Sequence, residues 1–292
     1  MCSDTGAVVA VSYASGGTGG QRPVLARAVV FLASGDTLWL DGTLDGGTRG
    51  ALTVRERDAA QYDLRLSARA TLLTGAARLT DGAAAAGAPV PVGLELTLEP
   101  ASQRLALGAG DVTLVRGGGS LSAGSVVHQV AGTAWSASGP DGVPGGRADC
   151  RVRAVFQDGS ALFLAGASAA AGAGPSAGGV AGEADVVAAL VHNTRIRATE
   201  VSGLASEEAV HGLAGRSVSW VAAGRAPAGA RGQVRDPQQQ VTVTGAGALS
   251  WNCAPYVFVR QGVTGLGVVE RVTREDGTGA STGASDELPD PY

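Results

Sequence analysis

Four ionisable side chains occupy the apolar positions of segments that alternate like half-buried strands. In such a strand every second side chain points to the same face, so parity places these groups on the inner face. A charged group is costly in an apolar interior unless it is paired, hydrogen-bonded or used in chemistry. A hydrogen-bonded core position or a strand end is the alternative for each. The candidate catalytic residues are His128, Glu200 and Glu270, and His192 is a candidate substrate contact.

A second group of side chains combines apolar bulk with polar tips, as the linings of small-molecule pockets do. The run from Trp251 to Tyr256 is typical of such a lining, although tryptophan is also a common core residue. Arg260 has the parity of Tyr256, so it can anchor a carbonyl or carboxylate, or lie over aromatic rings. The predicted substrate-binding residues are Tyr62, His192, Trp220, Trp251, Asn252, Tyr256 and Arg260.

The motifs of several enzyme classes are missing. The pattern G-x-S-x-G occurs at 174–178 and 279–283, but only in Gly-rich stretches that read as loops and not between a strand and a helix, and no G-x-G-x-x-G lies between a strand and a helix. All basic residues are arginine, which excludes a Schiff-base lysine, and the three histidines lack metal-ligand spacing. Three widely separated cysteines fit neither a disulfide framework nor a zinc site. We therefore predict no cofactor and no metal, and leave open a pair of carboxylates at glycosidase spacing.

The composition describes a folded chain with few classes of partner. Of 292 residues, 45% are hydrophobic and 16% charged, and 46 glycines interrupt the apolar runs as turns between short strands do. The net charge of −4 and the scattered arginines predict no nucleic-acid partner. No signal-peptide pattern and no long uncharged apolar stretch occur, so we expect no membrane contact and a cytoplasmic protein, monomeric or homodimeric.

The elements that must position these residues repeat along the chain. RAVVFLASGDTLWLDG at 27–42 and RAVFQDGSALFLAG at 153–166 each predict a β-hairpin that turns at a glycine. Similar segments follow in the same order, at 64–75 and 191–203 and at 126–135 and 258–267. The turns after Pro100 and Pro237 also correspond, so we predict a duplication.

The predicted architecture is all-β, with two tandem antiparallel units related by that duplication. Only Leu204–Leu213 has a pattern that suits a short helix. The predicted boundaries are an arm or first strand at 1–24, unit 1 at 25–145, unit 2 at 146–273 and a disordered tail at 274–292.

Four of these segments resemble the two-domain lipocalin-like superfamily, which includes carotenoid 1,2-hydratases and natural-product cyclases such as Diels–Alderases. They are the hairpin at 31–40, the GTAW strand end at 132–135, the hairpin at 156–164 and GVTGLGVVE at 262–270. The resemblance implies two lipocalin-like β-barrels and a hydrophobic substrate. Members that protonate alkenes tend to carry acids and histidines where the first unit closes. Here that region, 135–146, has Asp141 as its only acid.

We therefore predict a cofactor-free cyclase or isomerase, such as a Diels–Alderase, that shapes a hydrophobic polyketide-like intermediate in natural-product biosynthesis. Pericyclic reactions suit a site with few polar groups because they depend on confinement of one conformer. The alternatives are a non-catalytic carrier of hydrophobic metabolites, a structural β-protein of a phage or surface assembly, and a hydrolase or hydratase.

Overall fold

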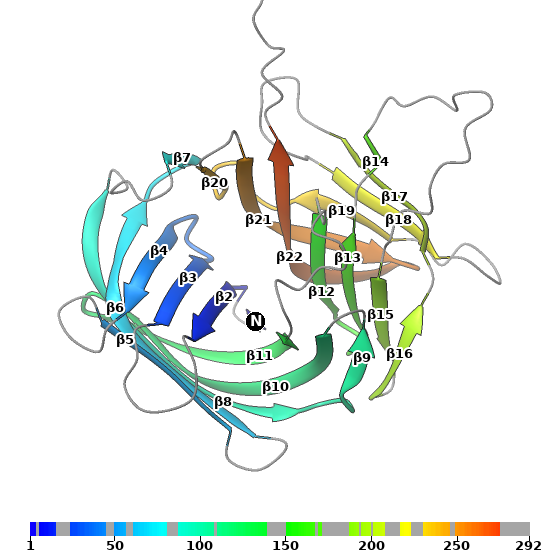
Figure 1. Cartoon of the computed structure of the whole chain (residues 1–292), viewed down its shortest axis with the longest axis horizontal. Coiled ribbons are helices and arrows are strands. Elements are labelled where there is room, and N and C mark those ends of the chain that lie inside the picture. The colour runs from blue at the N-terminus through cyan, green and yellow to red at the C-terminus, as the bar shows by residue number, and fades with distance from the viewer. Residues whose placement is uncertain are drawn as a thin grey trace, which may run out of the picture.

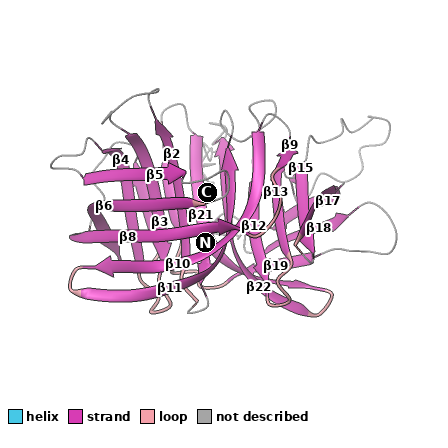
Figure 2. Cartoon of the chain, turned by 90° about the horizontal axis from the view of Figure 1, so that it is seen from below, coloured by secondary structure: helices cyan, strands magenta, loops and turns pink. Residues whose placement is uncertain are grey.

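Every regular element that the structure describes is a β-strand. The computed structural model describes residues 1–3, 6–15, 24–44, 50–56, 61–80, 87–107, 110–138, 150–166, 169–170, 187–192, 194–199, 201–207, 217–222, 230–245 and 249–274. Over these residues there is no helix, which confirms the all-β prediction (Figure 2), and hence no helix that could span a membrane. The helix predicted at Leu204–Leu213 is wrong where the chain is described, because Val201–Glu207 is strand β17. The predicted tail beyond residue 274 lies outside the described residues.

The first sheet closes on itself as a barrel. Its strand order is β11-β1-β2-β3-β4-β6-β8-β10-β9, with β5 paired to β6. Strand β11 pairs with β10 along its whole length and with β1 at Cys2 and Ser3, so the two ends of the sheet meet. The strands are β1 (Cys2–Ser3), β2 (Val8–Ser15), β3 (Val24–Phe31), β4 (Thr37–Leu44), β5 (Gly50–Glu56), β6 (Tyr62–Leu73), β8 (Ala88–Pro100), β9 (Leu105–Leu107), β10 (Gly110–Ala123) and β11 (Val126–Ser138).

The second sheet curves beside the first (Figure 1). Its order is β14-β17-β18-β19-β21-β22-β12-β13-β15-β16, with β20 beside β21. Strand β7 (Ala77–Thr80) leaves the first unit and pairs in parallel with β20. The other strands are β12 (Cys150–Phe156), β13 (Ala161–Gly166), β14 (Ala169–Ala170), β15 (Val187–His192), β16 (Arg195–Thr199), β18 (Ser217–Ala222), β19 (Ala230–Val234), β20 (Val241–Thr244), β21 (Leu249–Arg260) and β22 (Val263–Arg274).

Each sheet encloses an apolar interior made by one parity of its strands. In the first unit, Leu38, Leu94 and Leu121 are among the buried side chains of this interior. In the second, Phe258 fills the space that Gly232 and Gly267 leave, since a Cβ at either glycine would meet its ring. Both interiors are therefore packed by alternation, as the sequence predicts.

The opposite parity of the same strands forms the contact between the units. Val29, Phe31 and Trp39 of the first unit pack against Cys253 and Val268 of the second. Strands β9, β10 and β11 cover the outer side of β13, β15 and β16 in the same way. The outer faces of the repeated hairpins are thus buried between the units, although outer faces of an antiparallel barrel are commonly solvated.

Hydrogen bonds from two polar side chains join the units at one end of their contact. Arg235 donates to the carbonyl oxygens of Gly6 and Leu32. Gln239 Nε2 donates to Leu32 O at 2.7 Å and to Asp36 O at 3.0 Å. The turn before β20 therefore satisfies the backbone of the β3–β4 turn, and a fixed relation between the units follows.

Candidate functional site

The repeated hairpins place one arginine each at the contact between the units. Arg27 is on the β3 face of Val29 and Phe31, and Arg153 is on the β12 face of Val155, which are the faces turned to the other unit. Both arginines begin the R-A-V segment of their hairpin. Each hairpin therefore places one guanidinium group on the inter-unit face, at a different register: Arg27 faces Asp41 across its hairpin, and Arg153 faces Phe163.

Arg27 lies over two neighbouring tryptophans from different units. Its Cζ is 5.5 Å from the ring centroid of Trp39 and 4.9 Å from that of Trp251. Asp41 accepts from Nε at 3.2 Å and from Nη2 at 2.8 Å, a bidentate pair. The Trp39 and Trp251 rings are 5.7 Å apart. A cation on an aromatic platform therefore lies at this end of the contact.

Arg153 also lies over an aromatic ring but has a more deeply buried partner. Its Cζ is 6.0 Å from the Phe163 ring centroid, and Phe163 lies 5.8 Å from Trp135 of the first unit. Nη1 donates to Glu270 Oε2 at 2.5 Å. The Glu270 side chain is 9% exposed and that of Arg153 is 24% exposed. This ion pair is therefore largely withdrawn from water.

Cys253 lies between the two arginines. It is directly opposite Glu270 across the β21–β22 ladder, and its side chain is fully buried. Burial raises the pKa of the Cys253 thiol well above its usual value, and Glu270 adds to the rise. The positive charges of Arg153 and Arg27 both lower this pKa. We call Arg27, Cys253, Glu270 and Arg153 the inter-unit polar row.

The buried thiol should make the protein less stable in alkali. The folded pKa of Cys253 is raised, so above the unfolded thiol pKa of about 8.5 the unfolded chain releases a proton that the folded chain keeps. The contribution of this thiol to the free energy of unfolding is fully present below that pH and falls above it, by up to about 1.4 kcal/mol per pH unit. The free energy of unfolding, measured with urea between pH 7.5 and 10, should fall less steeply with pH in Cys253→Ala than in wild type. Equal slopes in both proteins would contradict this prediction.

Two of the predicted residues belong to this site. Glu270 is a member of the inter-unit polar row, and Trp251 stacks beside Arg27. Asn252, Tyr256 and Arg260 are also buried, but on the opposite face of β21, inside the second unit. The sequence therefore grouped side chains that the sheet separates, because Trp251 and Asn252 are adjacent in sequence and alternate in face.

The residues inside the second unit have structural partners. Asn252 Nδ2 donates to Thr242 Oγ1 at 2.9 Å, and Tyr256 stacks with Phe258 at 5.8 Å between centroids. Arg260 Nη2 donates to Ser160 Oγ at 2.9 Å, and its Cζ is 5.2 Å from the Phe156 ring. The arrangement of Arg260 over an aromatic ring is the alternative that the sequence left open.

The prediction that His128 and His192 lie inside is wrong, since both side chains are exposed. His128 has the inward parity, opposite Leu121, but is near the tip of the β10–β11 hairpin, where Val126 and Val127 are exposed too. His192 ends β15, and Thr194 with φ 64° turns the chain back into β16. His192 has the parity of Ala188 and Leu190, which face the interior of the second unit, but at the end of the strand its side chain is exposed.

Three further predicted residues do not join the inter-unit polar row. Tyr62 is half-buried on β6, where its hydroxyl accepts from Arg104 Nη2 at 2.9 Å. Glu200 and the side chain of Trp220 lie outside the described residues. Within the described ranges no three His, Cys, Asp or Glu side chains form a group that could hold a metal ion.

Sequence reasoning missed Arg27, Arg153 and Cys253, together with the aromatic residues that flank the two arginines. The repeated R-A-V hairpin starts carried a signal for the two arginines. Nothing in the sequence marks Cys253, because a lone cysteine in an apolar strand is most often a plain core residue.

The fold is similar to that of several solved proteins, although no protein-family model and no curated protein matches the sequence. An ATTH protein from Nitrosomonas europaea has a TM-score of 0.55 at 14% identity, over 93% of this chain and 89% of that one. CghA, solved with Sch210972, has a TM-score of 0.52 at 13% identity over 94% and 86%. Kievitone hydratase from Nectria haematococca gives 0.50 at 10% over 94% and 86%. The chain has the two-unit lipocalin-like fold that its sequence resembles.

Proposed function

We propose that the chain is a cofactor-independent cyclase or isomerase that binds a hydrophobic small molecule along the inter-unit polar row. The observation that carries the proposal is the pair of arginines, Arg27 and Arg153, each over an aromatic ring at the contact between the units. Aromatic walls bind apolar surface, while guanidinium groups recognise a carbonyl or an acidic oxygen. This combination suits a polyketide-like substrate with one polarised end.

The chemistry assigned to the row is charge stabilisation at a confined substrate. A guanidinium that donates to a substrate carbonyl stabilises the negative charge that develops there, an effect worth about 3 kcal/mol for a well-placed donor. Glu270 orients Arg153 through their hydrogen bond. The tryptophans restrict the substrate to few conformers, and such pre-organisation contributes several kcal/mol in ring-forming reactions.

The comparisons support a small-molecule enzyme and leave a second candidate. CghA was solved with a small molecule, and kievitone hydratase is an enzyme by name. Hydration is the second candidate because Glu270 is a buried carboxylate at the row. Cyclisation or isomerisation is favoured because Glu270 already accepts a charge-assisted hydrogen bond from Arg153 and is thereby engaged within the row.

Conversion of lipophilic metabolites tests the reaction class. Incubated with a lipophilic extract, the protein should convert a compound into an isomer of equal mass with a new retention time in mass spectrometry. Heat-denatured protein is the control. A product heavier by one water would favour the hydratase, and a compound that is bound and recovered unchanged would favour the carrier.

Binding of an aromatic anion tests the site. Anilinonaphthalene sulfonate should bind between the units, and Arg153→Met should weaken binding about tenfold or more, as loss of a hydrogen bond to a charged group does. Arg231→Met is the matched control, because Arg231 is exposed on β19. Tryptophan fluorescence quenching reports the binding. Equal affinity in wild type and Arg153→Met would remove Arg153 from the site.

A further inference from the structure

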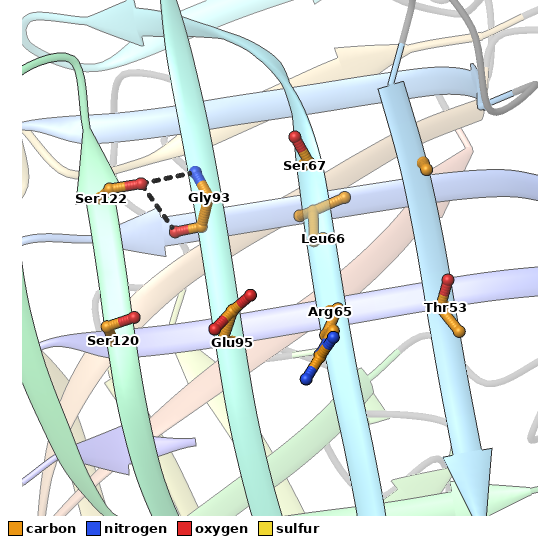
Figure 3. Close-up of a pocket in the computed structure, with 9 residues that line it drawn as sticks. Thr53, Arg65, Leu66, Ser67, Gly93, Glu95, Ser120 and Ser122 are labelled. Atoms are coloured by element: carbon orange, nitrogen blue, oxygen red, sulfur yellow. Dashed lines mark hydrogen bonds between the residues drawn. The ribbon is translucent and has the colours of Figure 1, made fainter.

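A polar hollow of about 330 Å³ lies on the outer face of the first unit, away from the inter-unit polar row. It crosses β5, β6, β8 and β10, and Figure 3 shows the side chains that line it. Hydroxyl groups, one guanidinium and one carboxylate supply its polar atoms. The polar side chains that line it are Thr53, Arg65, Ser67, Glu95, Ser120 and Ser122.

The hollow exists because one row of facing residues across the sheet has only small side chains. Ala51, Ser67, Gly93 and Ser122 face one another across four strands. Ser122 Oγ accepts from Gly93 N at 3.0 Å and donates to Gly93 O at 3.3 Å, so this hydroxyl is already used by the floor. No large side chain covers the bottom of the hollow. The next row of facing residues, which includes Arg65 and Glu95, forms its wall.

That wall carries opposite charges that do not pair with each other. Arg65 and Glu95 face each other across β6 and β8, where facing Cβ atoms are about 5 Å apart and opposite charges commonly pair. Both are exposed, and among the described residues neither forms a hydrogen bond or ion pair. Figure 3 draws dashed lines only between Ser122 and Gly93.

The neighbouring facing pairs behave differently. One row further along the same two strands, Thr97 Oγ1 donates to Asp63 Oδ1 at 3.2 Å. At the strand end, Gln61 Nε2 donates to Glu99 Oε1 at 3.0 Å. Arg116 and Glu99 also face each other across β10 and β8 without an ion pair among the described residues, so the adjacent hollow is what distinguishes Arg65 and Glu95.

We propose that this hollow binds a small zwitterion of the α-amino-acid type. The ligand's carboxylate pairs with the Arg65 guanidinium and its ammonium group with the Glu95 carboxylate. The hydroxyls of Thr53, Ser67 and Ser120 surround it. In an α-amino acid the two charges are close together, as the two side chains on neighbouring strands are.

The lining argues against other small ligands. It contains no aromatic ring, which a saccharide would use for stacking, and its charges offset each other, so neither an anion nor a cation alone matches it. The site is open to water, where ion pairs are weak. We therefore expect a dissociation constant of about 1–10 mM.

Titration of the isotope-labelled protein with glycine tests the site by residue-resolved NMR. The amide signals of Gly93, Ser120 and Ser122 should shift and saturate. Arg65→Gln or Glu95→Gln should weaken binding about tenfold. The exchange of both charges, Arg65→Glu with Glu95→Arg, should restore binding to within about threefold, because a zwitterion can bind reversed. Asp63→Asn, on the next row, is the matched control and should leave the affinity unchanged.

Several outcomes would overturn the proposal. Equal binding of N-acetylglycine would show an anion site, and equal binding of glycine methyl ester a cation site. Shifts of the same amides with glucose would show a polyol site, and the lack of saturation with glycine would show no site. None of these results tests Arg153 or the proposed reaction, because the inter-unit polar row shares no residue with the hollow.

Discussion

Glu270→Leu should lower the free energy of unfolding by about 3 kcal/mol, because it leaves the Arg153 guanidinium without its carboxylate. Removal of one partner from a buried pair costs about 3–5 kcal/mol. The lower end applies here, since 24% of the Arg153 side chain is exposed and water can reach it. Urea unfolding of purified wild type and variant measures the difference.

The double variant Glu270→Leu with Arg153→Met shows whether the loss of stability comes from the lost attraction within the ion pair or from the Arg153 guanidinium left without a partner. If the cost comes from the stranded guanidinium, the double variant should recover most of the loss, because apolar side chains often replace a buried pair without net cost. Strictly additive losses would contradict this account.

The arginine–carboxylate pair of the first unit supplies the control, although its carboxylate comes from the same hairpin and not from another strand pair. Arg27 and Asp41 are also a hydrogen-bonded ion pair over an aromatic ring, but their side chains are 27% and 20% exposed. Asp41→Leu should therefore cost only about 1 kcal/mol, as more exposed pairs do. A similar loss at both positions would show that burial does not decide the effect.

The hairpins were predictable because their signals are local. The turns at Gly35 and Gly159 have φ of 96° and 76°, which glycine adopts without strain, and apolar alternation defines the flanking strands. Strands β3, β4, β12 and β13 therefore lie where the sequence predicts them. The turn at Thr194 lacks such a glycine, so the reversal into β16 was not predictable. His192 keeps the parity of Ala188 and Leu190, but it lies at the end of β15, where its side chain is exposed.

The inter-unit contact was harder to predict because parity yields two faces and does not say which one is covered. A partial signal was present: Val29, Val30 and Phe31 are consecutive apolar residues, as in strands buried on both sides. The partner of each face is a long-range property. Arg27 meets Trp251 across more than two hundred positions of sequence, and no local pattern encodes that meeting.

The pairing of β12 with β22 beneath Arg153 depends on the absence of a side chain at Gly267. A Cβ there would lie 2.2 Å from Arg153 O and 2.9 Å from Ala154 Cα, and both are backbone atoms that cannot rotate away. Gly267→Ala should therefore cost about 3 kcal/mol, the upper range for overpacking, and Gly267→Val more. Urea unfolding measures both variants.

Two further variants identify the cause of this loss. Gly93→Ala is the matched control, because its Cβ would meet only the Ser122 hydroxyl, which can rotate, and the expected loss is about 1 kcal/mol or less. The Phe258 ring would also meet a Cβ at Gly267, at 2.7 Å. If the backbone contact decides, Phe258→Leu should not rescue Gly267→Ala. Rescue would show instead that the ring sets the cost, and the strand pairing that carries Arg153 would then tolerate a side chain at Gly267.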